Sequence, residues 1–120
     1  MQLEATALIV AGTDTTAVTL TYLVWAVLSS AAVHKALNEE LEGLTEGYTD
    51  ADLEALSYLT AVIDETLRLY GAAPGGLPRT VPEGGRILNG YFFPEGSTVT
   101  TQAYTLHRDP SLFPNPDRCV

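Results

Sequence analysis

Apolar residues dominate the first quarter of the chain and recur at helical spacing. From Leu20 to Leu28 they lie three or four residues apart, which predicts a helix over about residues 3–31. Val18 and Trp25 add apolar side chains on other faces of the same helix. A helix that is apolar all round belongs in the interior of a large protein. We therefore expect this helix to need more covering than the rest of these 120 residues provides.

A membrane span is the alternative interpretation of this segment. Residues 15–33 are nineteen residues without a charge, which is close to the length that crosses a bilayer. Against a span, seven Thr or Ser residues lie between Thr13 and Ser30, and Asp14 directly precedes the uncharged stretch. We favour a buried helix of a soluble domain.

Two shorter helices are predicted next. Residues 33–43 form an amphipathic pattern, with the apolar positions from Val33 to Leu41 on one face. Thr49 is a candidate N-cap for a short helix near residues 50–55.

A longer helix is predicted over residues 57–70, so that residues 50–70 form one helical region. Gly71 is a natural stop for it, and Pro74 follows. Its apolar stripe consists of Leu59, Ile63, Leu67 and Tyr70.

Beyond Gly71, frequent Gly and Pro break the chain into short pieces. Asn89-Gly90 is a hairpin signal between two of four predicted short strands. Residues 103–120 are expected to be largely irregular, with helical turns near 103–106 and 110–113. The predicted strands cover residues 77–81, 86–88, 91–93 and 98–102. The expected fold class is α+β, mainly helical.

Composition narrows the functional classes. The formal net charge of −9 argues against a nucleic-acid binder, which needs a basic face to neutralise phosphates. A single cysteine, Cys119, excludes an internal disulfide framework, and His34 and His107 are isolated, so no metal-ligand spacing exists.

The start of the chain carries no basic region typical of a signal peptide. Nine acids and no base lie between Lys35 and Arg68, and a solvated face explains them more simply than an acidic docking patch.

Three groups of residues carry candidate chemistry. Asp14 and Thr15, after the small Ala11 and Gly12, put a carboxylate and a hydroxyl inside an apolar helix, where an acid and a glycine both cost stability. Glu65 and Arg68 lie three residues apart on one helical face, and on a surface such a pair contributes only about 0.2–0.5 kcal/mol. The third group is Arg79, after a Gly- and Pro-rich bend.

Taken together, these motifs resemble those of the cytochrome P-450 superfamily, the haem-thiolate monooxygenases. The residues within the motifs are most similar to those of fungal, membrane-anchored members. The resemblance covers essentially the whole chain, with the motifs in the family's order. The matching runs are Ala11-Gly12-Thr13-Asp14-Thr15-Thr16, Glu65-Thr66-Leu67-Arg68, residues 90–99, His107-Arg108-Asp109-Pro110 and Phe113-Pro114-Asn115-Pro116.

By this resemblance, Asp14 and Thr15 are the acid–alcohol pair that delivers protons to iron-bound dioxygen. A hydroxyl can hold a water or the bound oxygen, and a nearby carboxylate can relay protons. Ala11 and Gly12 would open a groove for dioxygen beside the haem. The simpler interpretation of Thr15 is a hydroxyl bonded back to the carbonyl four residues earlier. Both can hold if the helix bulges there.

The resemblance also implies roles for the second half of the chain. Glu65 and Arg68 would be structural, joining an arginine further along in a network that locks the haem-binding core. Arg79 would pair with a haem propionate, although an ordinary surface arginine on a strand is the alternative. Gly75, Gly76 and Leu77 would line the substrate pocket.

One departure from the family pattern concerns the iron ligand. In the family a cysteine thiolate in a Phe-x-x-Gly-x-x-x-Cys-x-Gly loop binds the haem iron. Cys119 does not fit, because Leu112 stands where Phe is required and Asn115 where Gly is required. We therefore expect the ligand loop to lie beyond Val120. We also expect that Arg118 is not the third arginine of the network.

The chain is accordingly expected to be the central and C-terminal-side part of the cytochrome P-450 fold, and inactive alone. Residues 1–31 of this chain would be the oxygen-activation helix, and residues 103–120 would be an irregular segment. The parent would use haem, O2, a small organic substrate and an NADPH-dependent reductase. An anchor outside these residues would hold it in the endoplasmic reticulum membrane. A non-enzymatic membrane or helical interaction module is the rival class, and a gene product that never folds is a third possibility.

Overall fold

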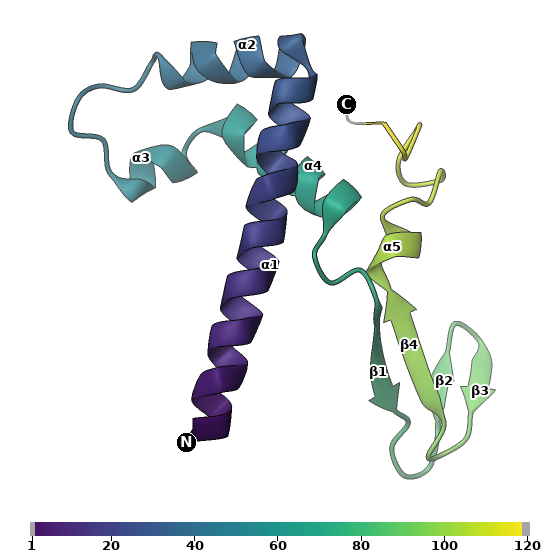
Figure 1. Cartoon of the computed structure of the whole chain (residues 1–120). Coiled ribbons are helices and arrows are strands. Elements are labelled where there is room, and N and C mark those ends of the chain that lie inside the picture. Colours follow the sequence, from purple (N-terminus) through teal and green to yellow (C-terminus); the bar gives the residue numbers. More distant parts are fainter. Residues whose placement is uncertain (1, 119–120) are drawn as a thin grey trace.

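The computed structural model describes residues 2–118, and it places a long helix beside a short helical hairpin and two small sheets. Helix α1 (Gln2–Ser29) runs unbroken, and α2 (Ala31–Leu41) leaves its end at a sharp angle (Figure 1). The break falls at Ser30, whose extended backbone and side chain, which accepts from the Val33 amide at 3.4 Å, begin the new helix. Both helix boundaries therefore come about two residues earlier than the pattern predicts.

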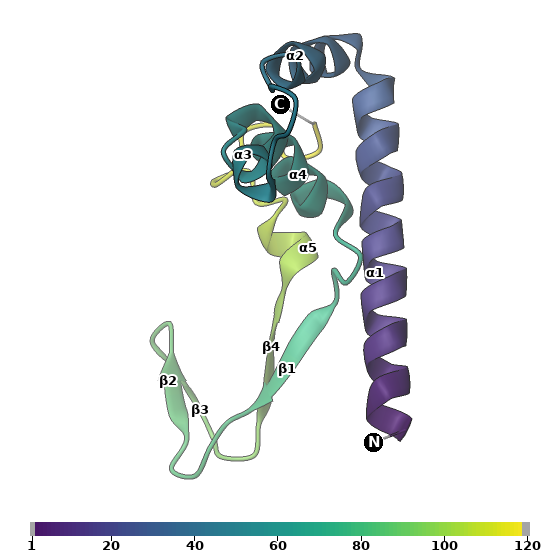
Figure 2. The same ribbon diagram turned by 90° about the vertical axis from the view of Figure 1, so that its left-hand side faces the viewer.

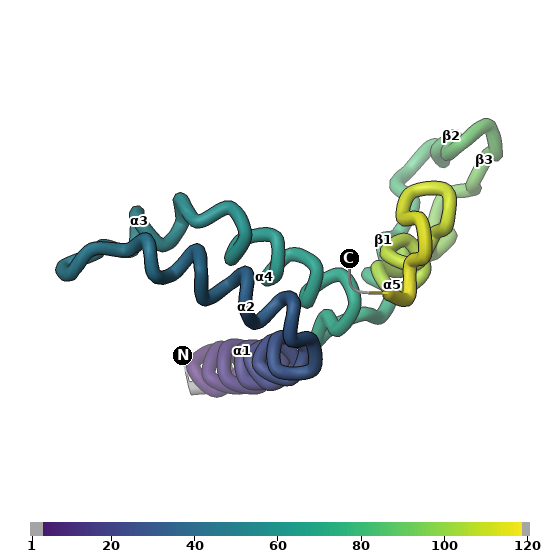
Figure 3. Tube along the Cα trace, turned by 90° about the horizontal axis from the view of Figure 1, so that it is seen from above, coloured from purple at the N-terminus to yellow at the C-terminus, as the bar shows by residue number. Residues whose placement is uncertain are grey.

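Helix α3 (Asp50–Glu54) and helix α4 (Ser57–Tyr70) follow a loop and bring the chain back toward α1. Thr49 is the N-cap of α3, as expected, and its backbone N–H and hydroxyl both donate to Asp52. Helices α2 and α4 lie side by side and run in opposite directions (Figure 3). Helix α4 also packs across α1 (Figure 1).

The strands form two separate antiparallel pairs. Strand β1 (Gly76–Thr80) pairs with β4 (Thr98–Gln102), so that Gly76 lies opposite Gln102. Strands β2 (Arg86–Leu88) and β3 (Tyr91–Phe93), which lie between β1 and β4 in the chain, pair with each other as a hairpin. Asn89 and Gly90 have positive φ, as the hairpin turn requires. Figure 2 shows this hairpin projecting from the end of the longer pair.

After β4 the chain makes one short helix and then turns. Helix α5 (Ala103–Leu106) occupies the first expected helical turn. The second expected turn, near residues 110–113, is present as a single hydrogen-bonded turn that does not extend into a helix. Leu112 and Phe113 both donate to the Asp109 carbonyl, but the chain turns away at once. Pro114 and Pro116 on either side of Asn115, whose φ is positive, explain why no helix continues.

Little of the chain is buried. Among the described side chains, the buried apolar ones are Val27, Leu69 and Val81. Most of α1 is exposed, including Leu8, Val24 and Trp25. The helix is long and apolar enough over Glu4–Ser29 to cross a membrane, a property that core helices of soluble proteins share.

Candidate functional site

The polar interruption of α1 lies half-way along the helix and does not break it. The Thr15 hydroxyl donates to the Ala11 carbonyl at 2.7 Å, which is the simpler of the two expected interactions. The helix stays α-helical through these residues, so the bulge considered from the sequence is not present. Thr19 repeats the pattern by donating to the Thr15 carbonyl at 2.9 Å.

Small side chains leave open space on the same part of α1. A Cβ atom added at Gly12 would meet nothing within 4 Å, and Asp14 is exposed. Nothing in the packing of the described residues therefore requires glycine at position 12, although alanine would be the better helix former.

A groove runs between α1 and the segment that follows α4, with a volume of about 450 Å³. Thr15 lies in its wall, and Ala72 and Ala73 lie opposite. These two alanines are functional candidates that the sequence interpretation missed, because only the packing of α4 across α1 brings them near Thr15. The full lining is Thr15, Thr16, Thr19, Leu20, Leu67, Gly71, Ala72 and Ala73.

The residues expected to line the substrate pocket lie elsewhere. Leu77 and Arg79 line a second groove, between the two strand pairs, and Gly75 and Gly76 belong to neither lining. Gly76 has a packing reason to be glycine, since a Cβ atom there would collide with the side chain of Thr100 on β4. Thr15 and Gly75–Leu77 are thus not brought together within the described residues.

Arg79 is exposed on β1, opposite Val99. Its Nη1 donates to the neighbouring Pro78 carbonyl at 2.9 Å. Because a guanidinium presents five donors in one plane, this bond through Nη1 leaves other donors accessible to a carboxylate.

Glu65 and Arg68 form a largely buried ion pair. Arg68 Nε and Nη2 donate to the two carboxylate oxygens of Glu65, each at 2.6 Å, so that the pair is bidentate. The Arg68 side chain is only 7% exposed and that of Glu65 is 21% exposed. This is a buried pair and differs from the weak surface pair that spacing alone predicts.

The rest of the Arg68 guanidinium binds backbone carbonyls of residues 107–118. Nη1 donates to the carbonyls of His107 and Pro116, both at 2.7 Å, and Nη2 to that of Arg118 at 3.3 Å. The ring of Phe113 lies 4.9 Å from the guanidinium carbon. Arg118 thus contributes its backbone carbonyl to this network.

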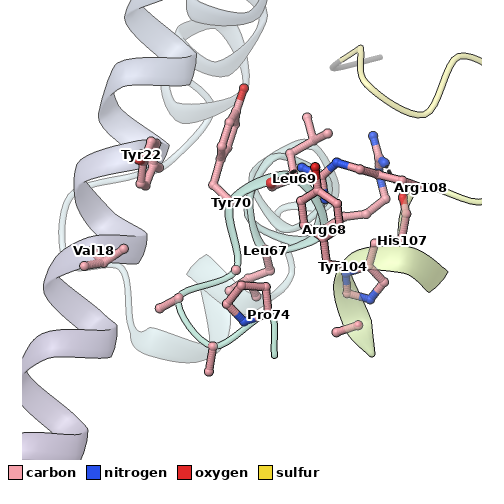
Figure 4. Close-up of a pocket in the computed structure, with 14 residues that line it drawn as sticks. Val18, Tyr22, Leu67, Arg68, Leu69, Tyr70, Pro74, Tyr104, His107 and Arg108 are labelled. Carbon is pink, nitrogen blue, oxygen red and sulfur yellow. Dashed lines mark hydrogen bonds between the residues drawn. The ribbon is translucent and has the colours of Figure 1, made fainter. Parts of the chain in front are cut away.

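A second arginine, Arg108, lies beside this network; in the sequence it is quoted only as part of a matching run and given no role. Its Nη2 donates to the Leu69 carbonyl in the last turn of α4 at 2.7 Å. Figure 4 shows Arg68, Leu69 and Arg108 together at one side of a pocket whose other side is formed by Val18 and Tyr22 of α1.

Two aromatic residues of α1 fix the position of α4. The rings of Tyr22 and Tyr70 stack with centroids 4.9 Å apart. Trp25 meets Tyr70 edge-on at 5.7 Å. These contacts hold the C-terminal end of α4 against α1, and with it the segment that lines the groove.

A carboxylate next to the network has a perturbed pKa. The Ser111 hydroxyl and then the Ser111 backbone N–H donate to Asp109, at 2.6 and 2.8 Å, and lower the pKa of that carboxyl. Hydrogen bonds to the charged form favour it, so Asp109 stays ionised to lower pH than an isolated aspartate.

The described residues fit part of a haem site. Arg79 offers a cation for a propionate, and the groove beside Thr15 offers a hydroxyl facing open space. Within residues 2–118 no group of His, Cys, Asp and Glu suits a metal ion. Cys119, which the sequence argues against as the iron ligand, lies outside the described residues.

Comparisons with known proteins agree on one family. The family model for cytochrome P-450 matches residues 1–118. Cytochrome P-450 monooxygenase tazI of Aspergillus terreus is 55% identical over 98% of this chain and 24% of its own length. Cytochrome P-450 monooxygenase cypX of Dothistroma septosporum is 51% identical over 88% of this chain and 21% of its own length. For stcB of Emericella nidulans, also a cytochrome P-450 monooxygenase, the identity is 48% over 95% of this chain and 22% of its own length. The chain spans about a quarter of the length of these curated relatives.

Proposed function

The chain belongs to the cytochrome P-450 family, and from this premise we propose that it is the oxygen-activating part of a haem-dependent monooxygenase. The groove between α1 and the segment after α4 carries the proposal, because it places the Thr15 hydroxyl opposite the small Ala72 and Ala73. A hydroxyl at the edge of open, mainly apolar space suits the handling of dioxygen beside a small organic substrate.

Haem, when bound, supplies the iron at which dioxygen is reduced and its O–O bond cleaved. In this proposal Arg79 pairs with a propionate carboxylate, and the sulfur ligand comes from residues other than 2–118. Ala11 and Gly12 leave the face of α1 open, so that small ligands reach Thr15.

The protons come through Thr15 and Asp14. The Thr15 hydroxyl, which donates to the Ala11 carbonyl at 2.7 Å, would turn from that carbonyl to hold a water or dioxygen in the groove. Asp14, exposed one residue earlier and outside the groove lining, would exchange protons with solvent and relay them to that hydroxyl through water. Electrons come from a redox partner, for which we propose an NADPH-dependent reductase, and the full-length protein is proposed to sit in the endoplasmic reticulum membrane.

We expect Thr15→Ala to uncouple oxygen consumption from product formation in a full-length protein that contains this segment. Loss of a positioned proton donor typically costs about 10²–10⁴-fold in the step it serves. The product formed per NADPH consumed should therefore fall, and hydrogen peroxide should rise.

The matched control is Thr21→Ala. Thr21 makes the same back-bond on the same helix, to the Ala17 carbonyl at 2.7 Å, but lies outside the groove lining. Thr15→Ser, which keeps the hydroxyl, should stay coupled. Equal uncoupling by Thr15→Ala and Thr21→Ala would exclude a special role for Thr15.

The rival function, a membrane or helix-interaction module, draws its support from the exposed apolar surface of α1. The buried Glu65–Arg68 network argues against it, since a simple span needs no such network. Partitioning of the chain into lipid vesicles, without haem binding by a full-length protein, would favour the rival.

A further inference from the structure

The C-terminal end of α4 and residues 107–118 hold each other through two arginines. Arg68 reaches from α4 to the His107 carbonyl at 2.7 Å. Arg108, which follows His107 in the chain, donates in return to the Leu69 carbonyl on α4 at 2.7 Å. We propose that Arg108 is a positioning residue, the second half of a reciprocal clamp that fixes residues 107–118 on α4 and thereby the core around Arg68.

The Leu69 carbonyl needs such a donor. The last carbonyls of a helix have no partner within the helix, and Leu69 is only 6% exposed. Many helices satisfy these carbonyls with a left-handed residue at the end, but Gly71 has φ −53° and ψ 129° and leads straight into extended chain. Arg108 supplies the missing hydrogen bond, and its positive charge is favourable at a helix C-terminus.

The guanidinium of Arg108 is held in place from two further sides. Its carbon atom lies 3.9 Å from the centroid of the Tyr104 ring, within cation–π range. Nε lies 3.3 Å from an Asp117 oxygen, but the Asp117 side chain is 82% exposed, so that this ion pair is screened by water. The ring and the buried carbonyl therefore define the position of Arg108.

This arrangement requires a planar cation. A guanidinium can lie flat on the Tyr104 ring while its edge donates to the Leu69 carbonyl. A lysine ammonium is a point charge and cannot make both contacts from one position. Because this half of the clamp depends on one side chain, a slip of the chain by one residue would break the contact of Arg108 with the Leu69 carbonyl.

Amide hydrogen exchange of the chain tests the clamp without any cofactor. The reporters are the amides of Leu112 and Phe113, which donate to Asp109, and that of Arg118, which donates to Asn115. Arg108→Ala and Arg108→Lys should each speed exchange at these amides by at least about tenfold, because the segment then opens locally. The His34 amide in α2, bonded to Ser30, reports whether the rest of the chain stays folded.

Two controls remove charge without removing the clamp. Asp117→Asn and Arg86→Ala, on the exposed strand β2, should leave the reporter amides within about twofold of the starting protein. Unchanged exchange in Arg108→Ala would overturn the proposal. So would exchange in Arg108→Lys equal to that of the starting protein. If Arg108→Ala unfolds the whole chain, Arg108→Lys decides.

A second measurement reaches the core and rests on the proposed function. In a full-length protein containing this segment, Arg108→Lys should lower the haem content and the carbon-monoxide difference signal, whereas Arg86→Ala should not. If the starting protein itself binds no haem, the proposed function fails while the exchange result still stands. If exchange changes but Arg108→Lys keeps full haem content, the clamp does not extend to the core and that part of the proposal is overturned.

Discussion

Arg68 shows at the scale of single residues how context changes the meaning of a spacing. Glu-x-x-Arg on a helix surface is a weak pair, but here both side chains are largely buried. The hydrogen bonds of Arg68 to Glu65 and to the backbone carbonyls are 2.6 to 3.3 Å long. A buried charge is tolerated only when it is fully paired and hydrogen-bonded. The three carbonyls from residues 107–118 supply the part that Glu65 cannot.

Arg68→Ala should therefore be strongly destabilising. Removing one partner of a buried pair costs about 3–5 kcal/mol, because the Glu65 carboxylate is left without its partner. Urea unfolding followed by the fluorescence of Trp25, which contacts Tyr70 at the end of α4, would measure the loss in free energy of unfolding. Arg86→Ala removes an exposed arginine and should change that free energy by less than about 0.5 kcal/mol. In a full-length protein Arg68→Ala should abolish haem incorporation, whereas Arg86→Ala should not.

Two aspartates give the folded chain a defined response to acid. The backbone N–H and then the hydroxyl of Thr49 lower the pKa of Asp52, and Ser111 lowers the pKa of Asp109. A carboxyl whose folded pKa lies below its unfolded value of 3.8 stabilises the fold above that value, and the stabilisation is lost as the pH falls through the folded pKa.

The free energy of unfolding should accordingly fall as the pH is lowered from about 4, since the unfolded chain then takes up more protons. Combining Asp52→Asn with Asp109→Asn should flatten this part of the pH profile, measured by urea unfolding at a series of pH values. An unchanged slope in the double variant would assign the acid response to other carboxylates.

At the scale of elements, Glu40 of α2 caps the N-terminus of α4. Its two carboxylate oxygens accept from the backbone amides of Tyr58 and Leu59, both at 2.8 Å, at the first turn of α4. The residue before that turn, Leu56, offers no side-chain cap. A carboxylate on α2 thus caps α4, where a negative charge also complements the helix dipole.

Glu40→Ala should destabilise the chain by about 1–2 kcal/mol, because it exposes two helix amides that Glu40 now satisfies. Glu39→Ala is the matched control. Glu39 pairs with Lys35 at 3.6 Å and both side chains are more than half exposed, so its loss should cost less than about 0.5 kcal/mol. Thermal unfolding by circular dichroism would compare the two, and equal effects would rule out the cap.

The whole molecule is open for its size. Its radius of gyration is 19.3 Å, whereas a compact domain of this length has about 14 Å. Its accessible surface is 9301 Å², about 3,000 Å² more than a compact monomer of the same mass exposes. Much of the excess is apolar side chain on α1 and on the β2–β3 hairpin, such as Leu28, Ile87 and Phe92.

The isolated chain should therefore associate with itself or bind a hydrophobic dye. Exposed apolar patches of this extent mark surfaces that other protein or lipid covers. Sedimentation velocity at several concentrations and dye fluorescence would measure this, with a full-length protein containing the segment as the comparison. A monodisperse monomer that binds no dye would show that α1 is covered in solution.

The sequence by itself determined the elements and the family. Asn89-Gly90 required a hairpin, Thr49 a helix start, and Gly71 a helix end, because each acts on backbone within a few residues of itself. Motif order along the chain sufficed for the cytochrome P-450 assignment, and α+β was the correct fold class. The roles of Asp14, Thr15 and Arg79 remain predictions that came from the sequence alone.

Only the tertiary structure decided which distant groups meet. The cap from Glu40 to α4, the carbonyls that Arg68 binds, and the alanines opposite Thr15 lie 18 to about 60 residues apart in the chain. A backbone carbonyl or amide is the same at every residue and leaves no mark in the sequence, so its partner is known only once the chain has folded. For the same reason the sequence placed Arg108 in a matching run but assigned it no partner, because that partner is the Leu69 carbonyl at the end of α4.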